Sequence, residues 1–416
     1  MVPTRIAHVD LDAFFAAVAA RDAGVAGDRP LVVAGRGARG VVAAANYPAR
    51  AFGIRAGQPL AAAQRACGEL VVADPDREAY EADSRAFRAI LREVTEVVEA
   101  TSIDEAFLDL TAAAGDVGDL VAWARRRVHA ELGLTATAGV AGCTVAAKVA
   151  GAEAKPDGQK VIPVGGDPAF LASQPLPAIP GVGPKTAAAL ARVGADHVAD
   201  LRQVDDAALH AAVGQATADW LRRVALGEER RHLTERGPAQ SVGQEVTVDG
   251  RVDTEEAEDY LGGLAVRVSQ RLAASGQLAA AVETVAADRQ GQRTRRQRLA
   301  EPTRHPRLLF DAAVRALDAM PWRGTLHRVG LRALDLTGGE PRELVVPAPL
   351  QPRWYADRTV VGHPTLGTGL VRRSDDTQTA VQFDRLPAGE VLVATSSLTP
   401  TDSVDAPPAE GPQALP

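Results

Sequence analysis

The chain has 416 residues, of which 46% are hydrophobic and 24% charged, and its formal net charge is −7. This length exceeds one ordinary compact core, so several domains are expected. The two cysteines, Cys67 and Cys143, belong to no Cys/His cluster, which argues against a disulfide scaffold and against structural zinc. The nearest candidate for a membrane span, 133–152, contains Lys148, so we expect a cytoplasmic protein that does not enter membranes.

The negative charge is unevenly distributed along the chain. From Gly338 to the end there are six basic and ten acidic residues, which leaves 40 basic and 43 acidic residues before it. The body of the chain is therefore nearly neutral, and local basic patches can still bind the phosphates of a nucleic acid. Four of the 46 basic residues are lysines, so each remaining lysine merits attention.

The first part of the chain interleaves predicted strands and helices, which is typical of a mixed α+β sheet. Alternating or short apolar runs predict strands over 5–9, 31–34, 40–45, 101–110 and 135–140. Apolar residues at helical spacing predict helices over 13–21, 80–98 and 119–132, and a helical stretch with Gly/Pro interruptions over 49–68.

The second part is organised differently. A Pro/Gly-rich stretch, 174–184, opens an all-helical segment that runs to about Arg236. A small α+β unit follows, with predicted strands from Ser241 and over 280–287, 297–302 and 326–336, and predicted helices over 254–274 and 306–320. A linker at 345–352 leads to a short β-rich module at 354–399, and the Ser/Pro/Ala tail, 400–416, is expected to be disordered.

Acidic residues stand at the ends of two predicted strands. Asp10 follows the first strand, and Asp104 with Glu105 interrupts a later one. If these strands are neighbours, the carboxylates converge and need hard divalent cations with oxygen ligands. Two magnesium ions there could clamp the attacking and leaving oxygens of a phosphoryl transfer. Taken singly, each acid is more typical of a solvated turn residue at a strand end.

Four segments resemble, in order and spacing, the motifs of Y-family, DinB-like translesion DNA polymerases. They are 8–18 (HVDLDAFFAAV), 45–54 (ANYPARAFGI), 101–109 (TSIDEAFLD) and 154–160 (AKPDGQK). The resemblance covers about residues 5–337 and implies a right-hand α+β architecture with a palm (5–21 and 74–164), fingers (22–73), a helical thumb (165–236) and a little finger (240–337). It also implies a low-fidelity DNA-directed DNA polymerase, a monomer that uses dNTPs to extend primer–template DNA past damage.

The resemblance also implies roles for individual residues. The catalytic ligands of two Mg²⁺ ions would be Asp10, Asp104 and Glu105, assisted by the carbonyl of Leu11. The incoming triphosphate would be held by Tyr47, Arg50 and Lys155. Phe15 occupies the position of the steric gate against a 2′-hydroxyl; Phe14 belongs to the same nucleotide-binding pair, although its ring is expected to pack in the core. The sequence departs from the family at Ala44, where Ser or Thr is usual, and over 141–148, where Lys148 alone keeps its place.

Further DNA contacts are expected outside these motifs. Gly181, Gly183 and Lys185 lie in a segment that resembles a helix-hairpin-helix, whose backbone N–H groups bind phosphate. An arginine cluster on a predicted connection between strands would contact the DNA backbone; it comprises Arg289, Arg293, Arg295, Arg296 and Arg298. The module at 354–399 resembles the Tudor/SH3-like tail of UvrD-like helicases and implies either a protein partner or a stabilising appendage. No convincing sliding-clamp peptide lies near the end of the sequence, so binding to a sliding clamp stays open.

Two alternatives remain open from the sequence. A non-catalytic family member could act as a scaffold, although the three carboxylates are present. A different two-metal enzyme, such as a nuclease or a cyclase, could use the same sheet, although the helix-hairpin-helix and the gate aromatic argue against a cyclase.

Overall fold

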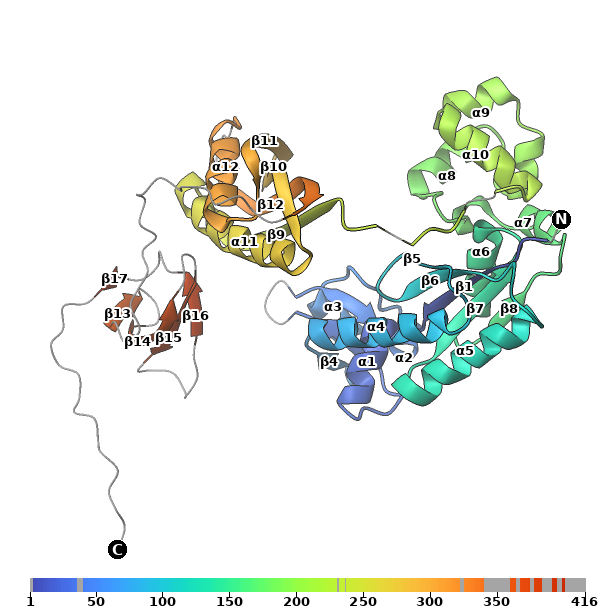
Figure 1. The fold of residues 1–416 in the computed structure, drawn as a ribbon, viewed down its shortest axis with the longest axis horizontal. Helices are drawn as coiled ribbons and strands as arrows, with labels where there is room; N and C mark the ends of the chain where they lie inside the picture. Colours follow the sequence, from blue (N-terminus) through green and yellow to red (C-terminus); the bar gives the residue numbers. More distant parts are fainter. Residues whose placement is uncertain are drawn as a thin grey trace, which may run out of the picture. The chain divides into compact units, whose positions relative to one another are not determined.

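The computed structural model describes residues 3–35, 40–229, 232–235, 237–321 and 325–339, together with the backbone of short strands between 360 and 400. The chain divides into two compact units, Met1–Arg236 and Gly237–Pro416 (Figure 1). In the part of the chain that is described, no helix has the length and apolar character needed to cross a membrane.

A five-stranded sheet forms the centre of the first unit. Its strands are β1 (Ile6–Leu11), β5 (Val98–Ala100), β6 (Glu105–Asp109), β7 (Ala136–Ala141) and β8 (Gln159–Val161). They are arranged in the order β5-β6-β1-β7-β8, so β1 is central and pairs antiparallel with both β6 and β7. Because strands at the centre of a sheet are covered on both faces, β1 is buried over nearly its whole length, including the polar His8.

Helices cover both faces of this sheet (Figure 1). On one face, α4 (Arg77–Arg92) and α5 (Val117–Leu132) share a core with Val9 and Leu11 of β1. On the other face, α6 (Thr144–Ala154) packs with the alternate residues of β1. The two faces of β1 therefore belong to different cores.

The backbone of α6 lies directly on β7. A Cβ atom at Gly139 would stand 2.0 Å from the carbonyl oxygen of Ala147, so glycine is required at this position. The sequence pattern does not indicate α6, because its residues are almost uniformly small and apolar and show no clear helical period.

A smaller layer carries the next group of elements. Its members are α1 (Phe14–Asp22), β2 (Leu31–Ala34), β3 (Val42–Ala45), α2 (Tyr47–Ala51), α3 (Leu60–Ala66) and β4 (Val71–Ala73), and its three strands have the order β3-β2-β4. The helical prediction over 49–68, with its Gly/Pro interruptions, corresponds to two short helices. The chain is interrupted between them because Gly53 and Gly57 adopt positive φ values of 77° and 88° and Pro59 follows.

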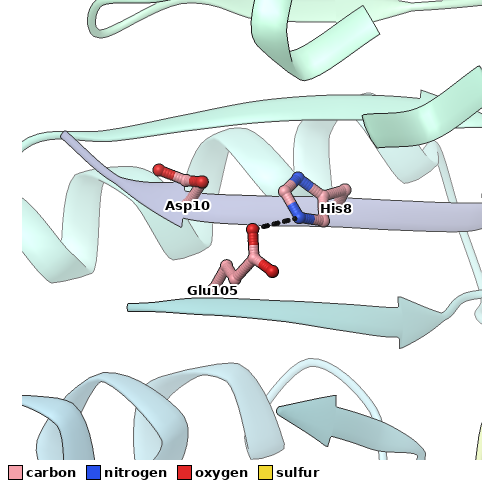
Figure 2. Close-up of side chains that lie close together, drawn as sticks. All are labelled: His8, Asp10 and Glu105. Carbon is pink, nitrogen blue, oxygen red and sulfur yellow. Dashed lines mark hydrogen bonds and ion pairs between the residues drawn. The ribbon is translucent and has the colours of Figure 1, made fainter. Parts of the chain in front are cut away.

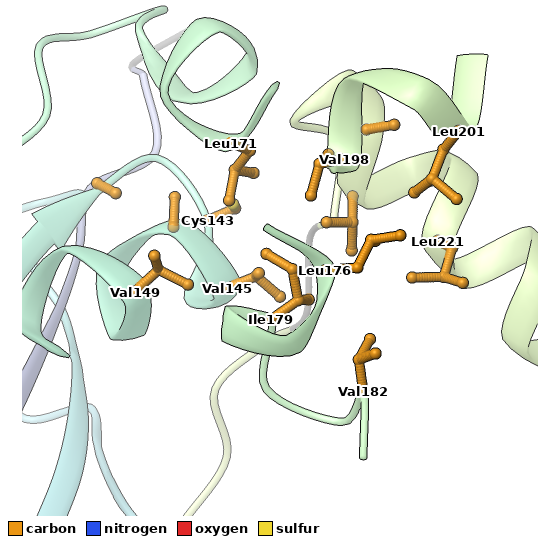
Figure 3. Close-up of a cluster of buried hydrophobic side chains, with 14 of the residues drawn as sticks. Cys143, Val145, Val149, Leu171, Leu176, Ile179, Val182, Val198, Leu201 and Leu221 are labelled. Carbon is orange, nitrogen blue, oxygen red and sulfur yellow. The ribbon is translucent and has the colours of Figure 1, made fainter. Parts of the chain in front are cut away.

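A helical segment completes the first unit. It contains α7 (Asp167–Ala172), α8 (Pro184–Ala191), α9 (Asp206–Val213) and α10 (Gln215–Leu226), with 3₁₀ turns η1 (Leu176–Ala178) and η2 (Val198–Arg202). Side chains of α6, such as Val145 and Val149, share one core with Leu171, Leu201 and Leu221 of this segment (Figure 3). The all-helical prediction is confirmed, and this shared core fixes the segment on the sheet.

The second unit contains a four-stranded antiparallel sheet with two helices. Its elements are β9 (Ser241–Val252), α11 (Thr254–Ala274), β10 (Gln277–Asp288), β11 (Gly291–Thr303), α12 (Pro306–Asp318) and β12 (Leu326–Gly338), and the strand order is β11-β10-β12-β9. Each element expected between 241 and 336 is present. Asp253 and Glu256 exchange hydrogen bonds between side chain and backbone at the start of α11, which fixes that helix end.

The arginine cluster requires a correction. Arg293, Arg295, Arg296 and Arg298 lie on the edge strand β11 itself, and Arg289 alone lies in the turn that connects it to β10. The strand begins six residues earlier than expected. Its first half is rich in arginine and glutamine and is mostly exposed, so it lacks the apolar residues by which a strand is recognised in the sequence.

Five further strands are described between 360 and 400. They are β13 (Val360–His363), β14 (Gly367–Ser374), β15 (Gln378–Phe383), β16 (Val391–Ala394) and β17 (Thr399–Pro400), paired in the order β16-β15-β14-β13-β17. The predicted linker at 345–352 and the tail from 401 lie outside the described residues. The resemblance of 354–399 to a Tudor/SH3-like module stays a prediction.

Candidate active site

Two carboxylates and an imidazole meet on one face of the five-stranded sheet. Asp10 of β1 lies opposite Glu105 of β6 in the antiparallel register, and His8 lies two residues earlier on β1. Successive side chains of a strand alternate between its faces, so His8 and Asp10 share a face. One ligand atom from each of the three residues lies within 4.8 Å of the others (Figure 2). Such a set of oxygen and imidazole donors fits a divalent cation.

Glu105 is held by three donors. Lys148 Nζ, on α6, lies 2.8 and 2.7 Å from the two carboxylate oxygens, the Thr101 hydroxyl donates to Oε1 at 2.7 Å, and His8 Nε2 lies 3.2 Å from Oε2. The hydrogen bond from His8, together with those from Lys148 and Thr101, holds the pKa of Glu105 well below its usual range although burial acts the other way. Glu105 is therefore charged and fixed in place.

Asp10 has the opposite balance. Lys155 pairs with its carboxylate, yet burial raises the pKa of Asp10 above its ordinary value because the loss of hydration outweighs this attraction. A bound divalent cation would add positive charge beside Asp10 and favour its ionised form.

Asp104 lies beside this cluster and is not a member of it. It stands just before β6, where its backbone carbonyl accepts a hydrogen bond from Leu11 N at 2.9 Å and its carboxylate accepts one from the Ser102 hydroxyl. Its charge opposes ionisation of Asp10, which shows that the two carboxylates are near neighbours. The predicted convergence of the three carboxylates thus holds for Asp10 and Glu105, with Asp104 at the rim.

A cleft of about 720 Å³ opens over Asp10 and Asp104. One wall comes from the end of β1 and the start of α1, and the other from β3, α2 and the loop that follows α2. The lining residues are Asp10, Leu11, Ala13, Phe14, Phe15, Ala43, Ala44, Ala45, Arg50, Arg55, Ala56, Asp104 and Lys155. Cations from one wall and carboxylates from the other suit a ligand that carries both phosphate and metal.

Tyr47 and Arg50 belong to the same short helix, α2. The guanidinium of Arg50 lies 4.7 Å from the centre of the Tyr47 ring, and its Nε donates to the carbonyl of Ala45 at 2.9 Å. The Tyr47 hydroxyl donates to Asp12 Oδ1 at 3.2 Å. Burial and the nearby charge of Asp12 raise the pKa of Tyr47 to about 12, so its hydroxyl stays protonated and is a donor.

Phe15 and Phe14 have different surroundings. Both rings border the cleft, but Phe14 is buried at 3% exposure in the core beneath α4, whereas Phe15 is partly exposed. The Phe15 ring stacks on Tyr80 of α4, with ring centres 4.3 Å apart and an interplanar angle of 22°. Phe14 therefore packs in the core, as expected, while Phe15 presents a supported aromatic ring to the cleft.

The predicted helix-hairpin-helix residues lie in a turn between η1 and α8. Gly181 adopts a φ of 99°, which favours glycine, and Gly183 precedes the first residue of α8. Lys185 lies in the first turn of that helix.

Sequence reasoning missed several groups at the site. His8 stands two residues before Asp10, so the two-residue period of a strand could have found it. The sequence marks Lys148 only by its retained position in the motif, and it gives no local sign that Tyr80 supports Phe15. Their relation to Glu105 and Phe15 depends on how α6 and α4 pack, which the local sequence does not reveal.

Comparison with known proteins agrees with this arrangement. Residues 9–152 match the impB/mucB/samB family and residues 239–345 match the C-terminal domain of the same family. DNA polymerase IV of Halorhodospira halophila is 41% identical over 273 residues, which cover 64% of this chain and 76% of that protein. DNA polymerase IV of Dehalococcoides mccartyi strain CBDB1 is 32% identical over 354 residues, covering 83% of this chain and 90% of that protein.

Two solved structures share the fold. The Y-family DNA polymerase chimera Dbh-Dpo4(243-245)-Dbh has a TM-score of 0.76 at 23% identity, and an insertion ternary complex of Dbh DNA polymerase has a TM-score of 0.60 at 22% identity. Each comparison covers 80% of this chain and 100% of the other. With the motif-bearing strands and the cleft of the first unit, these findings show that the chain belongs to the DNA polymerase IV family of Y-family translesion DNA polymerases.

Proposed function

We propose that the cleft is a two-metal nucleotidyl-transfer site, in which Asp10, Asp104 and Glu105 hold two Mg²⁺ ions with the help of the Leu11 carbonyl. The observation that carries this proposal is the opposition of Glu105, in the antiparallel register, to Asp10, which lines the cleft. Two ions bound there would stabilise the attacking 3′-oxygen of a primer and the leaving pyrophosphate of a dNTP.

The chain's own residues do the remaining work. Arg50 and Lys155 line the cleft and provide positive charge for the triphosphate, and Tyr47, whose hydroxyl donates to Asp12, would bind it beside Arg50. Lys155 pairs with Asp10, and it would be available to bind phosphate if a cation took its place at that carboxylate. Lys148 and His8 keep Glu105 charged and oriented. Ala44 lines the cleft without a hydroxyl, so it contributes no hydrogen bond to the triphosphate.

Phe15 selects deoxynucleotides in this proposal. Its ring reaches the cleft and is backed by Tyr80, so it cannot withdraw easily to admit a 2′-hydroxyl. Within a site that is otherwise open, this contact discriminates by steric exclusion.

Primer–template DNA is proposed to contact both units. The backbone N–H groups around Gly181 and Gly183 and the amine of Lys185 would bind phosphate without reading sequence. The arginines of β11 and Arg289 would add contacts to the DNA backbone from the second unit. We further propose that the module at 354–399 docks a protein partner, and that the enzyme acts as a cytoplasmic monomer.

Primer extension on undamaged and abasic templates tests the proposed function. The wild-type chain should extend the primer with dNTPs and Mg²⁺, pass the abasic site, and use rNTPs poorly. Phe15→Ala should admit rNTPs, while Phe14→Leu should leave the sugar preference unchanged. Absence of extension by the wild type, or equal rNTP use by the wild type and Phe15→Ala, would contradict the proposal.

A further inference from the structure

Asp12 is a buried carboxylate that none of the proposed roles uses. It follows β1, two residues after Asp10, and only 3% of its surface is exposed. Burial of a charged group is costly unless hydrogen bonds compensate, so the partners of Asp12 indicate what the group is for.

The two oxygens of Asp12 serve two different segments of the cleft. Oδ1 accepts a hydrogen bond from the Tyr47 hydroxyl at 3.2 Å, and Oδ2 accepts one from the backbone N of Asp157 at 2.8 Å. The hydroxyl of Thr137, on β7, lies 2.8 and 3.0 Å from the two oxygens and anchors the carboxylate to the sheet. One rigid group thus links α2, the central sheet and the loop that carries Lys155.

The loop 155–158 contains a residue, Asp157, whose backbone is held by side chains from other elements. Asp157 has a φ of 47°, a left-handed conformation that non-glycine residues seldom adopt without support. Asp12 holds its N–H, and Arg125 on α5 donates to its carbonyl oxygen at 2.6 Å and to its Oδ1 at 2.8 Å. Lys155 lies two residues before this clamped peptide, so its ammonium position depends on it.

We propose that Asp12 is a positioning residue that sets the spacing between Tyr47 and Lys155, the two groups assigned to the triphosphate. This inference rests on the proposed function. Tyr47 and Lys155 are far apart in the sequence. Asp12 is hydrogen-bonded both to the Tyr47 hydroxyl and to the loop that carries Lys155. Its effect is therefore on nucleotide binding, and it does not touch the reacting atoms.

The test measures KM for the dNTP, kcat, and the Kd of a non-hydrolysable dNTP analogue for Asp12→Ala and Asp12→Asn. Loss of hydrogen bonds to a charged group predicts a rise of about tenfold or more in KM and Kd for Asp12→Ala, with kcat changed by less than about threefold. Asp12→Asn should be milder, since an amide retains one acceptor. A stability defect would instead lower the active fraction and leave KM and Kd unchanged.

A double-mutant cycle provides the decisive control. In a background of Tyr47→Phe and Lys155→Ala, the further substitution Asp12→Ala should no longer change KM or Kd, because both of its targets are gone. The same fold change in both backgrounds, or unchanged KM and Kd in the single variants, would overturn the role of Asp12. If Asp12→Ala does not fold, Asp12→Asn carries the same cycle. A wild type that fails to extend primers overturns the proposed function, and this inference with it; unchanged variants of an active wild type overturn the inference alone.

Discussion

The two central sheets of the molecule hold their charged side chains in different ways. In the first unit, Glu105 is 15% exposed and is gripped by Lys148 of a helix that lies on the sheet. In the second unit, Arg296 on the edge strand β11 pairs with Asp335 while both side chains remain about half exposed. Charges fixed by packed neighbours can orient metals and substrates, whereas exposed charges can only attract DNA in a way that salt weakens.

The close contact between α6 and β7 should give the largest effect. Gly139→Ala places a Cβ against the backbone of α6, where no side chain can move aside. We expect the first unit to lose about 3 kcal/mol or more of stability, measured by urea unfolding. Gly338→Ala, in the other sheet, is the matched control because a Cβ added there would meet no other atom within 4 Å. Equal effects of the two substitutions would refute the difference between the sheets.

Removing one partner from each type of ion pair should give the next largest difference. Lys148→Met leaves Glu105 partly buried without its cation, and we expect a loss of about 2 kcal/mol at neutral pH. Arg296→Ala removes an exposed partner of Asp335 and should cost less than about 1 kcal/mol. Thermal unfolding of both variants checks this order, and a larger cost for Arg296→Ala would contradict it.

The two carboxylates of the site should respond to pH in opposite directions in the presence of EDTA. The depressed pKa of Glu105 means that its stabilising contribution is complete above its ordinary pKa and is lost as the pH falls below it. The raised pKa of Asp10 means that its contribution is complete below its ordinary pKa and is lost as the pH rises through the folded value. Unfolding free energies measured from pH 7 to pH 3 test both signs.

Single substitutions separate these two contributions. Glu105→Gln should reduce by about 1 kcal/mol the unfolding free energy that the protein loses between pH 7 and pH 3. Asp10→Asn should stabilise the metal-free protein at pH 7 by a similar amount. If Asp10→Asn destabilises the metal-free protein at pH 7, the predicted sign for Asp10 is wrong.

The smallest effects are expected on β11. Arg298→Ala should leave stability within about 0.5 kcal/mol, because the residue is exposed on an edge strand. If it contacts phosphate, the slope of log K for DNA binding against log salt should become shallower by about 0.9. An unchanged slope would remove Arg298 from the DNA interface.

The sequence was most informative where structure is local. Helix α11 (Thr254–Ala274) has its predicted bounds, because a capping box starts it and its apolar residues follow a helical period. Asp10 and Glu105 could be identified as a pair only from the resemblance, since their register depends on the pairing of strands far apart in the chain. The hydrogen bond between Asp12 and Asp157 joins residues 145 positions apart and has no local signature. Register and helix packing, rather than propensity, decide such contacts.

The central claim is tested most directly by primer extension with Mg²⁺, comparing the wild type with Asp104→Ala and with Asp109→Ala. Asp109 is the matched control, because it lies at the far end of the same strand β6, where its carboxylate accepts from Thr111 N. We expect extension by the wild type and Asp109→Ala, and a loss in kcat of about a thousandfold or more for Asp104→Ala. Extension by Asp104→Ala at the wild-type rate would contradict it.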